Sequence, residues 1–273
     1  MNLYQIIGTV VLAILSIILA FFLVKGIRDD IVSTARIKQG ENTIIEQLKL
    51  IRETELVFQE VNGRFTSDWD RLMAFVDTGT YYITQRREEI ITLSYGADSI
   101  VVHIDTLGSV PVKERILREY SYVTAADSGV FNGFLVKMGD QVVNRMDVYR
   151  MTPTGKNGTV IKAINVGEVV DIEPVQPGDE IVKGQNLIQL LNYKFDPNTD
   201  FSRLPFVPVY GNENVKFEIF ADKIDKSGVT VDVIEVVNPR PLDPTRDEDS
   251  DFANRRHLRF GSKTQVSTAG NWE

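Results

Sequence analysis

The sequence predicts an α+β protein, with an N-terminal transmembrane helix that continues into an amphipathic stem and then a β-rich soluble body. Three observations predict it. An uncharged apolar run occupies 6–24, an apolar stripe with helical spacing follows over 41–60, and alternating β-branched segments dominate after residue 79. A run of about nineteen apolar residues is long enough to cross roughly 30 Å of hydrocarbon as a helix.

The apolar run is interpreted as an uncleaved anchor. It is longer than the roughly 7–15 apolar residues of a signal peptide, no basic residue precedes it, and no small-x-small cleavage site follows it. Orientation stays open. Lys25, Arg28, Arg36 and Lys38 follow the run, and the positive-inside rule would place the body in the cytoplasm.

Composition limits the function. The chain has 273 residues, a net charge of −8 and no cysteine. Its acidity disfavours a broad nucleic-acid interface. The lack of cysteine excludes disulfides, thiolate catalysis and cysteine-based metal sites.

The stem is predicted from helical spacing and from stop signals. Gly40 is expected to kink the link to the anchor, and Asn62-Gly63 is expected to end the helix. The segment 66–68 offers an N-cap for a short second helix that ends at Thr78-Gly79. The apolar stripe consists of Ile44, Ile45, Leu48, Ile51 and Phe58.

The strands are predicted from period-two alternation. They are expected at 90–93, 99–104, 159–164, 215–220 and 229–237, with a hairpin across 226–228 between the last two. From 238 to about 256 the chain is rich in Pro, Asp and Arg, which predicts a solvated tail. The predicted divisions are a transmembrane anchor (1–25), a helical stem (26–79), the first part of the β-rich body (80–119), a β insertion (120–191), the second part of the body (192–237) and a polar tail (238–273).

The stem carries a resemblance. The pattern "IR..E..F....GRFT.DWD.L..F" over 51–75 is similar to the helical stem of type IV pilins and type II secretion pseudopilins. More closely, the chain resembles an uncharacterised single-span membrane protein family of Bacteroidota. The resemblance implies an envelope protein with a periplasmic body. A basic leader ending in Gly and an early Glu in the apolar run are missing, so prepilin processing and polymerisation are not carried over.

A second resemblance lies in the insertion. The phrase "V.PGD.IVKGQ.LI.L" over 175–190 is similar to the half-motifs of biotinyl/lipoyl-type sandwiches, with 158–170 as an expected companion. Lys162 and Lys183 lack the sequence setting of a modified lysine, so a β-hairpin with a Pro-Gly-Asp turn is expected and no cofactor is assigned.

Candidate chemistry is sparse. His103 is expected on a strand face and His257 in a solvated basic tail. Two alternating acidic groups, at 196–200 and 247–251, lack the Gly and the final Glu of an EF-hand. Asx turns are expected there, with calcium binding outside the EF-hand pattern as the alternative. No catalytic, cofactor-binding or metal residue is therefore assigned.

The expected function is a non-catalytic, single-pass inner-membrane protein that serves as a structural or docking component of a pilus-like or secretion-type assembly. A membrane-fusion-type periplasmic adaptor and a cytoplasm-facing tethered scaffold remain as alternatives. The expected partners are the lipid bilayer, other envelope proteins and a second copy of the chain, without nucleic acid. Trp272 is expected to be a packing residue, with partner docking as the alternative.

Overall fold

The computed structural model describes residues 3–92, 98–210, 213–226 and 228–273. Within these residues the chain is α+β with a β-rich body, as the sequence predicts. It forms two compact units. The first unit contains 1–69 and 202–273, and the second unit contains 70–201.

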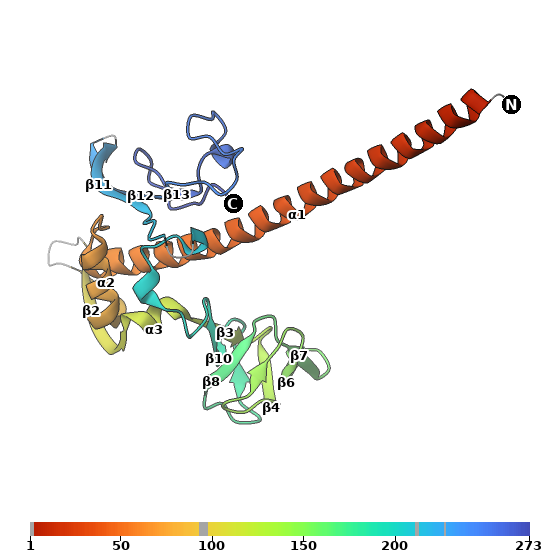
Figure 1. Ribbon diagram of the computed structural model, residues 1–273. Coiled ribbons are helices and arrows are strands. Elements are labelled where there is room, and N and C mark those ends of the chain that lie inside the picture. The colour runs from red at the N-terminus through yellow and green to blue at the C-terminus, as the bar shows by residue number, and fades with distance from the viewer. Residues whose placement is uncertain (1–2, 93–97, 211–212, 227) are drawn as a thin grey trace. The chain divides into compact units, whose positions relative to one another are not determined.

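The first unit is organised by one long helix. Helix α1 runs from Leu3 to Asn62 without interruption (Figure 1). The kink predicted at Gly40 is therefore wrong. A side chain at this position would overlap Leu242, so the glycine instead lets the C-terminal segment lie close against the helix. The predicted end of the helix is confirmed, because Gly63 follows it with a φ of +71°.

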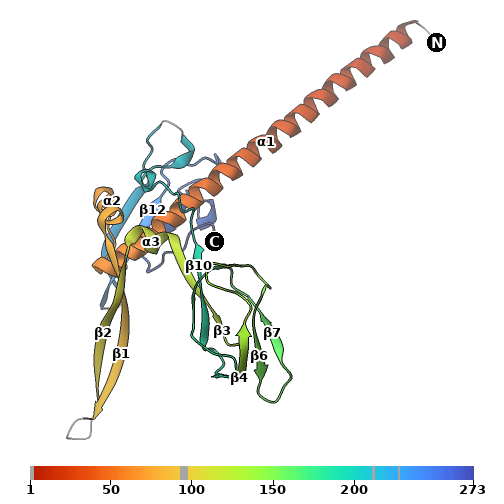
Figure 2. The ribbon, with the colours of Figure 1, turned by 90° about the horizontal axis from the view of Figure 1, so that it is seen from below.

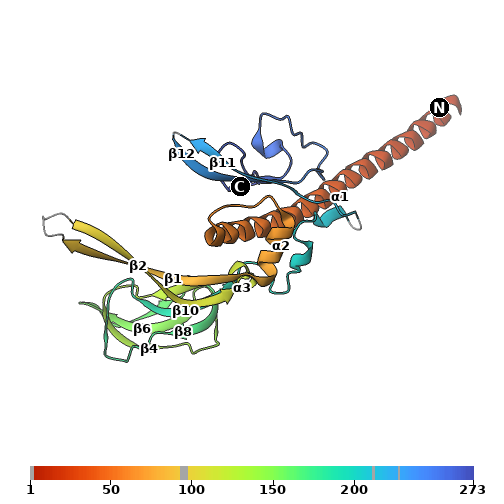
Figure 3. The same cartoon turned by 90° about the vertical axis from the view of Figure 1, so that its left-hand side faces the viewer.

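The C-terminal part of α1 packs in the first unit with a three-stranded antiparallel sheet, as Figures 1 and 3 show. The strands are β11 (Glu218–Lys226), β12 (Val229–Val237) and β13 (Arg259–Gly261), in that order across the sheet. The predicted hairpin is confirmed by the pairing of Lys226 with Val229. The strand predicted at 215–220 begins later, at Glu218. The core of this unit includes Ile44, Leu48, Ile51, Phe58, Phe217, Val233, Ile234, Val236, Leu258 and Phe260.

The segment of α1 just before its buried part, over which the side chains are described without a gap, has no buried side chain. From Ile31 to Thr43 every side chain is exposed or only partly covered. No helix in the described part of the chain is both long enough and apolar enough to cross a membrane. Most side chains of the anchor predicted at 6–24 lie outside that part.

Helix α2 (Trp69–Thr78) has bounds that match the predicted cap and stop signals, and all of it after Trp69 belongs to the second unit. A long antiparallel ribbon follows, made of β1 (Thr80–Thr92) and β2 (Asp98–Pro111). The strands predicted at 90–93 and 99–104 fall within this ribbon, although residue 93 lies outside the described residues. Helix α3 (Val112–Leu117) then leads from the ribbon into a β-sandwich (Figure 2).

The sandwich consists of two four-stranded sheets, with the orders β3-β10-β8-β5 and β7-β6-β4-β9. It runs from Arg118 to Tyr193, close to the predicted insertion 120–191. Phe131, Val148, Tyr149, Met151 and Leu190 are fully buried between the sheets. The strands are β3 (Arg118–Thr124), β4 (Gly129–Phe134), β5 (Gln141–Val142), β6 (Asp147–Pro153), β7 (Thr159–Lys162), β8 (Gly167–Ile172), β9 (Glu180–Ile181) and β10 (Asn186–Tyr193).

The sandwich contains an internal repeat that the sequence analysis missed. The segments 136–146 and 175–185 read "VKMGDQVVNRM" and "VQPGDEIVKGQ". They form the same turn, in which the aspartate carboxylate accepts a hydrogen bond from the backbone N–H three residues earlier, at 2.8 Å for Asp140 and 2.7 Å for Asp179. The segment 158–170, predicted as a partial companion of the second turn, contributes to β7 and β8 of the same sandwich.

Two further domain predictions need correction. The β-rich body was expected to combine 80–119 with 192–237, but 80–119 belongs to the second unit and 202–237 to the first. In the stretch 238–256, which was expected to be solvated, every side chain after the buried Asn238 is exposed or partly covered. The rest of the predicted polar tail is not solvated throughout, because Leu258 and Phe260 are buried and β13 joins the sheet. Short 3₁₀ turns complete the chain at Phe201–Arg203, Pro208–Tyr210 and Ala253–Arg255.

Candidate functional site

A groove of about 610 Å³ opens in the second unit, where the base of the β1–β2 ribbon, α3 and strands β3 and β10 come together. Its volume falls within the roughly 300–1,000 Å³ of small-molecule sites. Three tyrosines, two aliphatic residues, five charged residues and one glutamine line it. The groove therefore offers aromatic surface and hydrogen-bonding groups together.

One wall of the groove is the outer face of the β3–β10 pair. Tyr120 and Tyr122 are two residues apart on β3, so they lie on the same face, opposite the buried Val123. Gln189 on β10 pairs in register with Tyr122, and its amide donates a hydrogen bond to the Tyr122 hydroxyl at 3.2 Å. Tyr120 is 47% exposed and Tyr122 is 43% exposed. Both rings are therefore accessible.

The opposite wall comes from the base of the ribbon. Tyr81 on β1 pairs with Val110 on β2, and Ile83 lies two residues beyond Tyr81 on the same face. The Arg115 guanidinium lies 5.0 Å from the centre of the Tyr81 ring, within cation–π range. This wall presents a small apolar surface with a positive charge at one side.

Charge in the groove is nearly balanced. Arg115, Arg118 and Lys194 face it, together with Glu114 and Glu119. Arg118 is paired with Glu114 at 2.5 Å. The groove thus carries no concentrated field of one sign.

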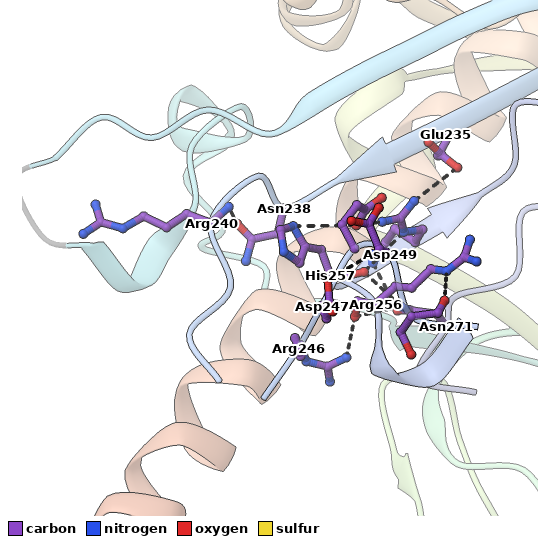
Figure 4. Close-up of polar contacts among 12 residues, drawn as sticks. Glu235, Asn238, Arg240, Arg246, Asp247, Asp249, Arg256, His257 and Asn271 are labelled. Atoms are coloured by element: carbon purple, nitrogen blue, oxygen red, sulfur yellow. Dashed lines mark hydrogen bonds and ion pairs between the residues drawn. The ribbon is translucent and has the colours of Figure 1, made fainter. Parts of the chain in front are cut away.

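A second polar arrangement holds the C-terminal segment in the first unit (Figure 4). Arg246 reaches α1 and pairs with both carboxylate oxygens of Glu41, with Nη2 3.1 Å from Oε2. The same guanidinium donates to the carbonyls of Asn254 and Arg256, at 3.0 and 2.8 Å. Both paired side chains are about 15% exposed. Arg246 therefore ties an irregular segment to the helix through four acceptors.

Further side chains complete this attachment. The Asn271 amide donates to the carbonyls of Ala253 and His257, each at 2.9 Å. Arg52 on α1 pairs with the Glu273 side chain at 2.6 Å. The segment from Arg246 to Glu273 is therefore folded, because polar side chains satisfy backbone groups that regular secondary structure would otherwise pair.

The two histidines do not form a catalytic arrangement. His257 was expected in solvent, but its side chain is only 19% exposed, and its Nδ1 lies 3.7 Å from Glu248, beyond hydrogen-bond range. His103 lies exposed on β2, as expected of a strand-face residue.

The acidic groups form turns. Asp196 accepts the Asn198 backbone N–H at 2.8 Å, and Asp247 accepts that of Asp249 at 3.0 Å, which are the predicted Asx turns. In the described part of the chain, no three His, Asp or Glu side chains come together to hold a metal ion.

Glu55 is the most strongly perturbed acid in the described part of the chain. It is fully buried in the first unit, and burial raises its pKa from 4.5 to about 8, against the lowering effect of the Thr66 N–H. Its Oε2 accepts that N–H at 3.1 Å, whereas Oε1 has no hydrogen-bond partner among the described residues. Glu55 thereby fixes the turn after α1 and is neutral at pH 7.

Comparison with known proteins finds no family model and no curated protein that matches this chain.

The two lysines considered in the insertion lie on its surface. The Lys162 ammonium lies 3.4 Å from Asp147, and the backbone N–H of Lys183 donates to the Ser128 hydroxyl at 3.1 Å. The loop between β6 and β7 carries Lys156, which the sequence analysis did not consider, and its Nζ lies 2.9 Å from Asp127. At the C-terminus, the Trp272 ring packs against Gly270, where a side chain would overlap it. This contact agrees with the packing role expected for Trp272.

Proposed function

We propose that this chain is a non-catalytic inner-membrane protein, anchored once through the N-terminal part of α1, with a periplasmic body that docks other envelope components. The observation that carries the proposal is the difference in burial between the two parts of α1. Its C-terminal part supplies the core of the first unit, whereas the continuously described segment before Ile44 buries no side chain. Among the described side chains of the apolar run, Leu12, Leu19 and Phe21 are more than 60% exposed, which supports insertion of this run into a lipid bilayer.

The pilin-like stem supports an assembly role. Positions quoted in the resemblance have defined structural tasks: Glu55 binds the Thr66 N–H, Gly63 ends α1, and the Trp69 indole donates to the Phe217 carbonyl at 3.2 Å. The apolar start of α1 and its continuation into an amphipathic part also agree with the stem that the resemblance implies. Parallel contacts between such stems would form a pilus-like or secretion-type assembly.

The sandwich favours a second candidate, a membrane-fusion-type adaptor. Its two four-stranded sheets and its repeated Gly-Asp turns agree with the biotinyl/lipoyl-type resemblance. The basic residues after the apolar run favour a third, a cytoplasm-facing scaffold.

Orientation is tested by protease digestion of a C-terminal tag in spheroplasts and in lysed cells. Digestion in intact spheroplasts is expected for a periplasmic body. Protection until lysis would contradict the pilin-like and adaptor proposals and favour the scaffold.

Assembly is tested by disulfide cross-linking, for which the chain is suited because it lacks cysteine. Single cysteines are placed at 31–34, one full turn of α1, and the membranes are oxidised. Val229→Cys is the matched control, because Val32 and Val229 are 57% and 61% exposed. Stem packing predicts a cross-linked product at one or more of the α1 positions and none at the control. A uniform lack of products along α1 would contradict the assembly role.

A further inference from the structure

The groove of the second unit has the features of a ligand site that the assembly role does not use. Two tyrosine rings stand side by side on β3, separated by roughly 7 Å along the strand, and a third tyrosine lines the opposite wall. A ligand that enters here meets tyrosine rings from β1 and β3 and aliphatic side chains from the ribbon. It also meets amide, carboxylate and guanidinium groups at their edges.

The charged residues of the lining limit which chemical class of ligand the groove can bind. Three basic and two acidic side chains line the groove, and Arg118 and Glu114 are paired. A nucleotide or another polyanion would meet two carboxylates as well as the cations, which costs binding free energy. A lipid tail would remove the charged and amide groups of the lining from water without offering them hydrogen bonds, which costs free energy. The lining therefore fits a ligand that is neutral, rich in hydroxyl groups and flat on its apolar faces.

Sugar rings combine these properties. Each pyranose has an apolar face of C–H groups that packs on an aromatic ring, and a rim of hydroxyls that pair with planar polar side chains. Gln189 is held beside the Tyr122 ring by its hydrogen bond to the hydroxyl, so its carboxamide is already oriented. Preorganisation of this kind lowers the entropic cost of binding.

We propose that the groove binds a short neutral oligosaccharide, with Tyr120 and Tyr122 as the stacking platform and Gln189 as a hydrogen-bonding residue. The volume of about 610 Å³ suits a ligand of this size. The site lies within the second unit, so it is independent of α1 and of the assembly role proposed above.

The test is isothermal titration of the full-length chain with three neutral sugars: tetra-N-acetylchitotetraose, cellotetraose and maltotetraose. The chain is held in a zwitterionic detergent, because a detergent with a sugar headgroup would compete. Tyr120→Ala/Tyr122→Ala and Gln189→Leu are the site variants. Tyr82→Ala is the matched control, since Tyr82 is 60% exposed on the neighbouring position of β1 and lies outside the groove.

At least one tetrasaccharide is expected to bind. The tyrosine double variant should lose at least tenfold in affinity, Gln189→Leu should lose several-fold, and Tyr82→Ala should bind as the unaltered chain does. Circular dichroism verifies that each variant is folded, and Gln189→Leu keeps the test decisive if the double variant is not. Lack of binding by all three sugars would overturn the proposal, as would equal affinity in the site variants and the control. Groove-dependent binding of a nucleotide or an extended peptide, with no sugar bound, would also overturn it.

Discussion

Replacement of Glu55 by glutamine should remove a pH dependence of stability that the buried carboxyl imposes on the first unit. The side chain is fully buried in α1, and burial raises its pKa from 4.5 to about 8. Below pH 4.5 the carboxyl is neutral in both the folded and the unfolded chain. Between pH 4.5 and 8 it stays protonated when folded but ionises when unfolded, so unfolding releases a proton.

The free energy of unfolding must therefore fall as the pH rises through this window. Each pH unit costs about 1.4 kcal/mol, so the full window corresponds to about 5 kcal/mol. Between pH 5.5 and 7.5 the expected loss is about 3 kcal/mol. Glu55→Gln keeps the shape and an oxygen acceptor for the Thr66 N–H, but it cannot ionise. The free energy of unfolding of Glu55→Gln should therefore not show this loss of about 3 kcal/mol between pH 5.5 and 7.5.

The assay is denaturant unfolding followed by tryptophan fluorescence. The chain has two tryptophans, Trp69 and Trp272, and both belong to the first unit, so the signal reports on that unit. Glu60→Gln, at an exposed position of the same helix, is the matched control and should decline as the unaltered chain does. Parallel curves for the unaltered chain and Glu55→Gln, within about 1 kcal/mol across the range, would refute the inference that the folded protein holds this carboxyl neutral.

Three further substitutions test which contacts and backbone conformations stabilise each unit by itself. Arg246→Lys should destabilise the first unit by about 2–4 kcal/mol, because an ammonium cannot span Glu41 and two carbonyls at once, and limited proteolysis should then cleave near residue 246. If Arg246→Lys resists the protease as the unaltered chain does, the attachment of the C-terminal segment does not depend on this guanidinium. Gly261→Ala should cost about 3 kcal/mol or more in denaturant unfolding, since Gly261 has a φ of +81° and a Cβ would overlap the Ile234 carbonyl; a loss below 1 kcal/mol would contradict this. Arg145→Gly should stabilise the second unit by about 1 kcal/mol in thermal unfolding, because Arg145 has a φ of +66°, and an unchanged or lower midpoint would show that no strain is relieved.

Part of the fold follows from local sequence signals. The end of α1 was predictable because Gly63 follows it and adopts a positive φ that other residues resist. The start of α2 was predictable because the 66–68 segment offers an N-cap directly before it. The β11–β12 hairpin followed from alternation on both sides of a short turn. These features depend on residues close in the chain, so local preference and periodicity are sufficient to predict them.

The candidate groove was not predicted, although one signal was present. Tyr120 and Tyr122 alternate with other residues on β3, which indicates a common face, but nothing in the sequence shows that the ribbon and β10 meet that face. The internal repeat was also visible in the letters of 136–146 and 175–185, and a search for self-similarity would have found it.

The sequence by itself determined that the chain is α+β with a β-rich body, and it determined where α1 ends and where α2 begins and ends. Only the tertiary structure decided that 80–119 and 202–237 belong to different units, that the C-terminal segment is folded, and that Glu55 is a buried acid. The physical reason is that these outcomes depend on contacts between residues far apart in the chain. Arg246 pairs with Glu41 across more than two hundred residues, and a polar side chain does not reveal in the sequence which distant group will satisfy it.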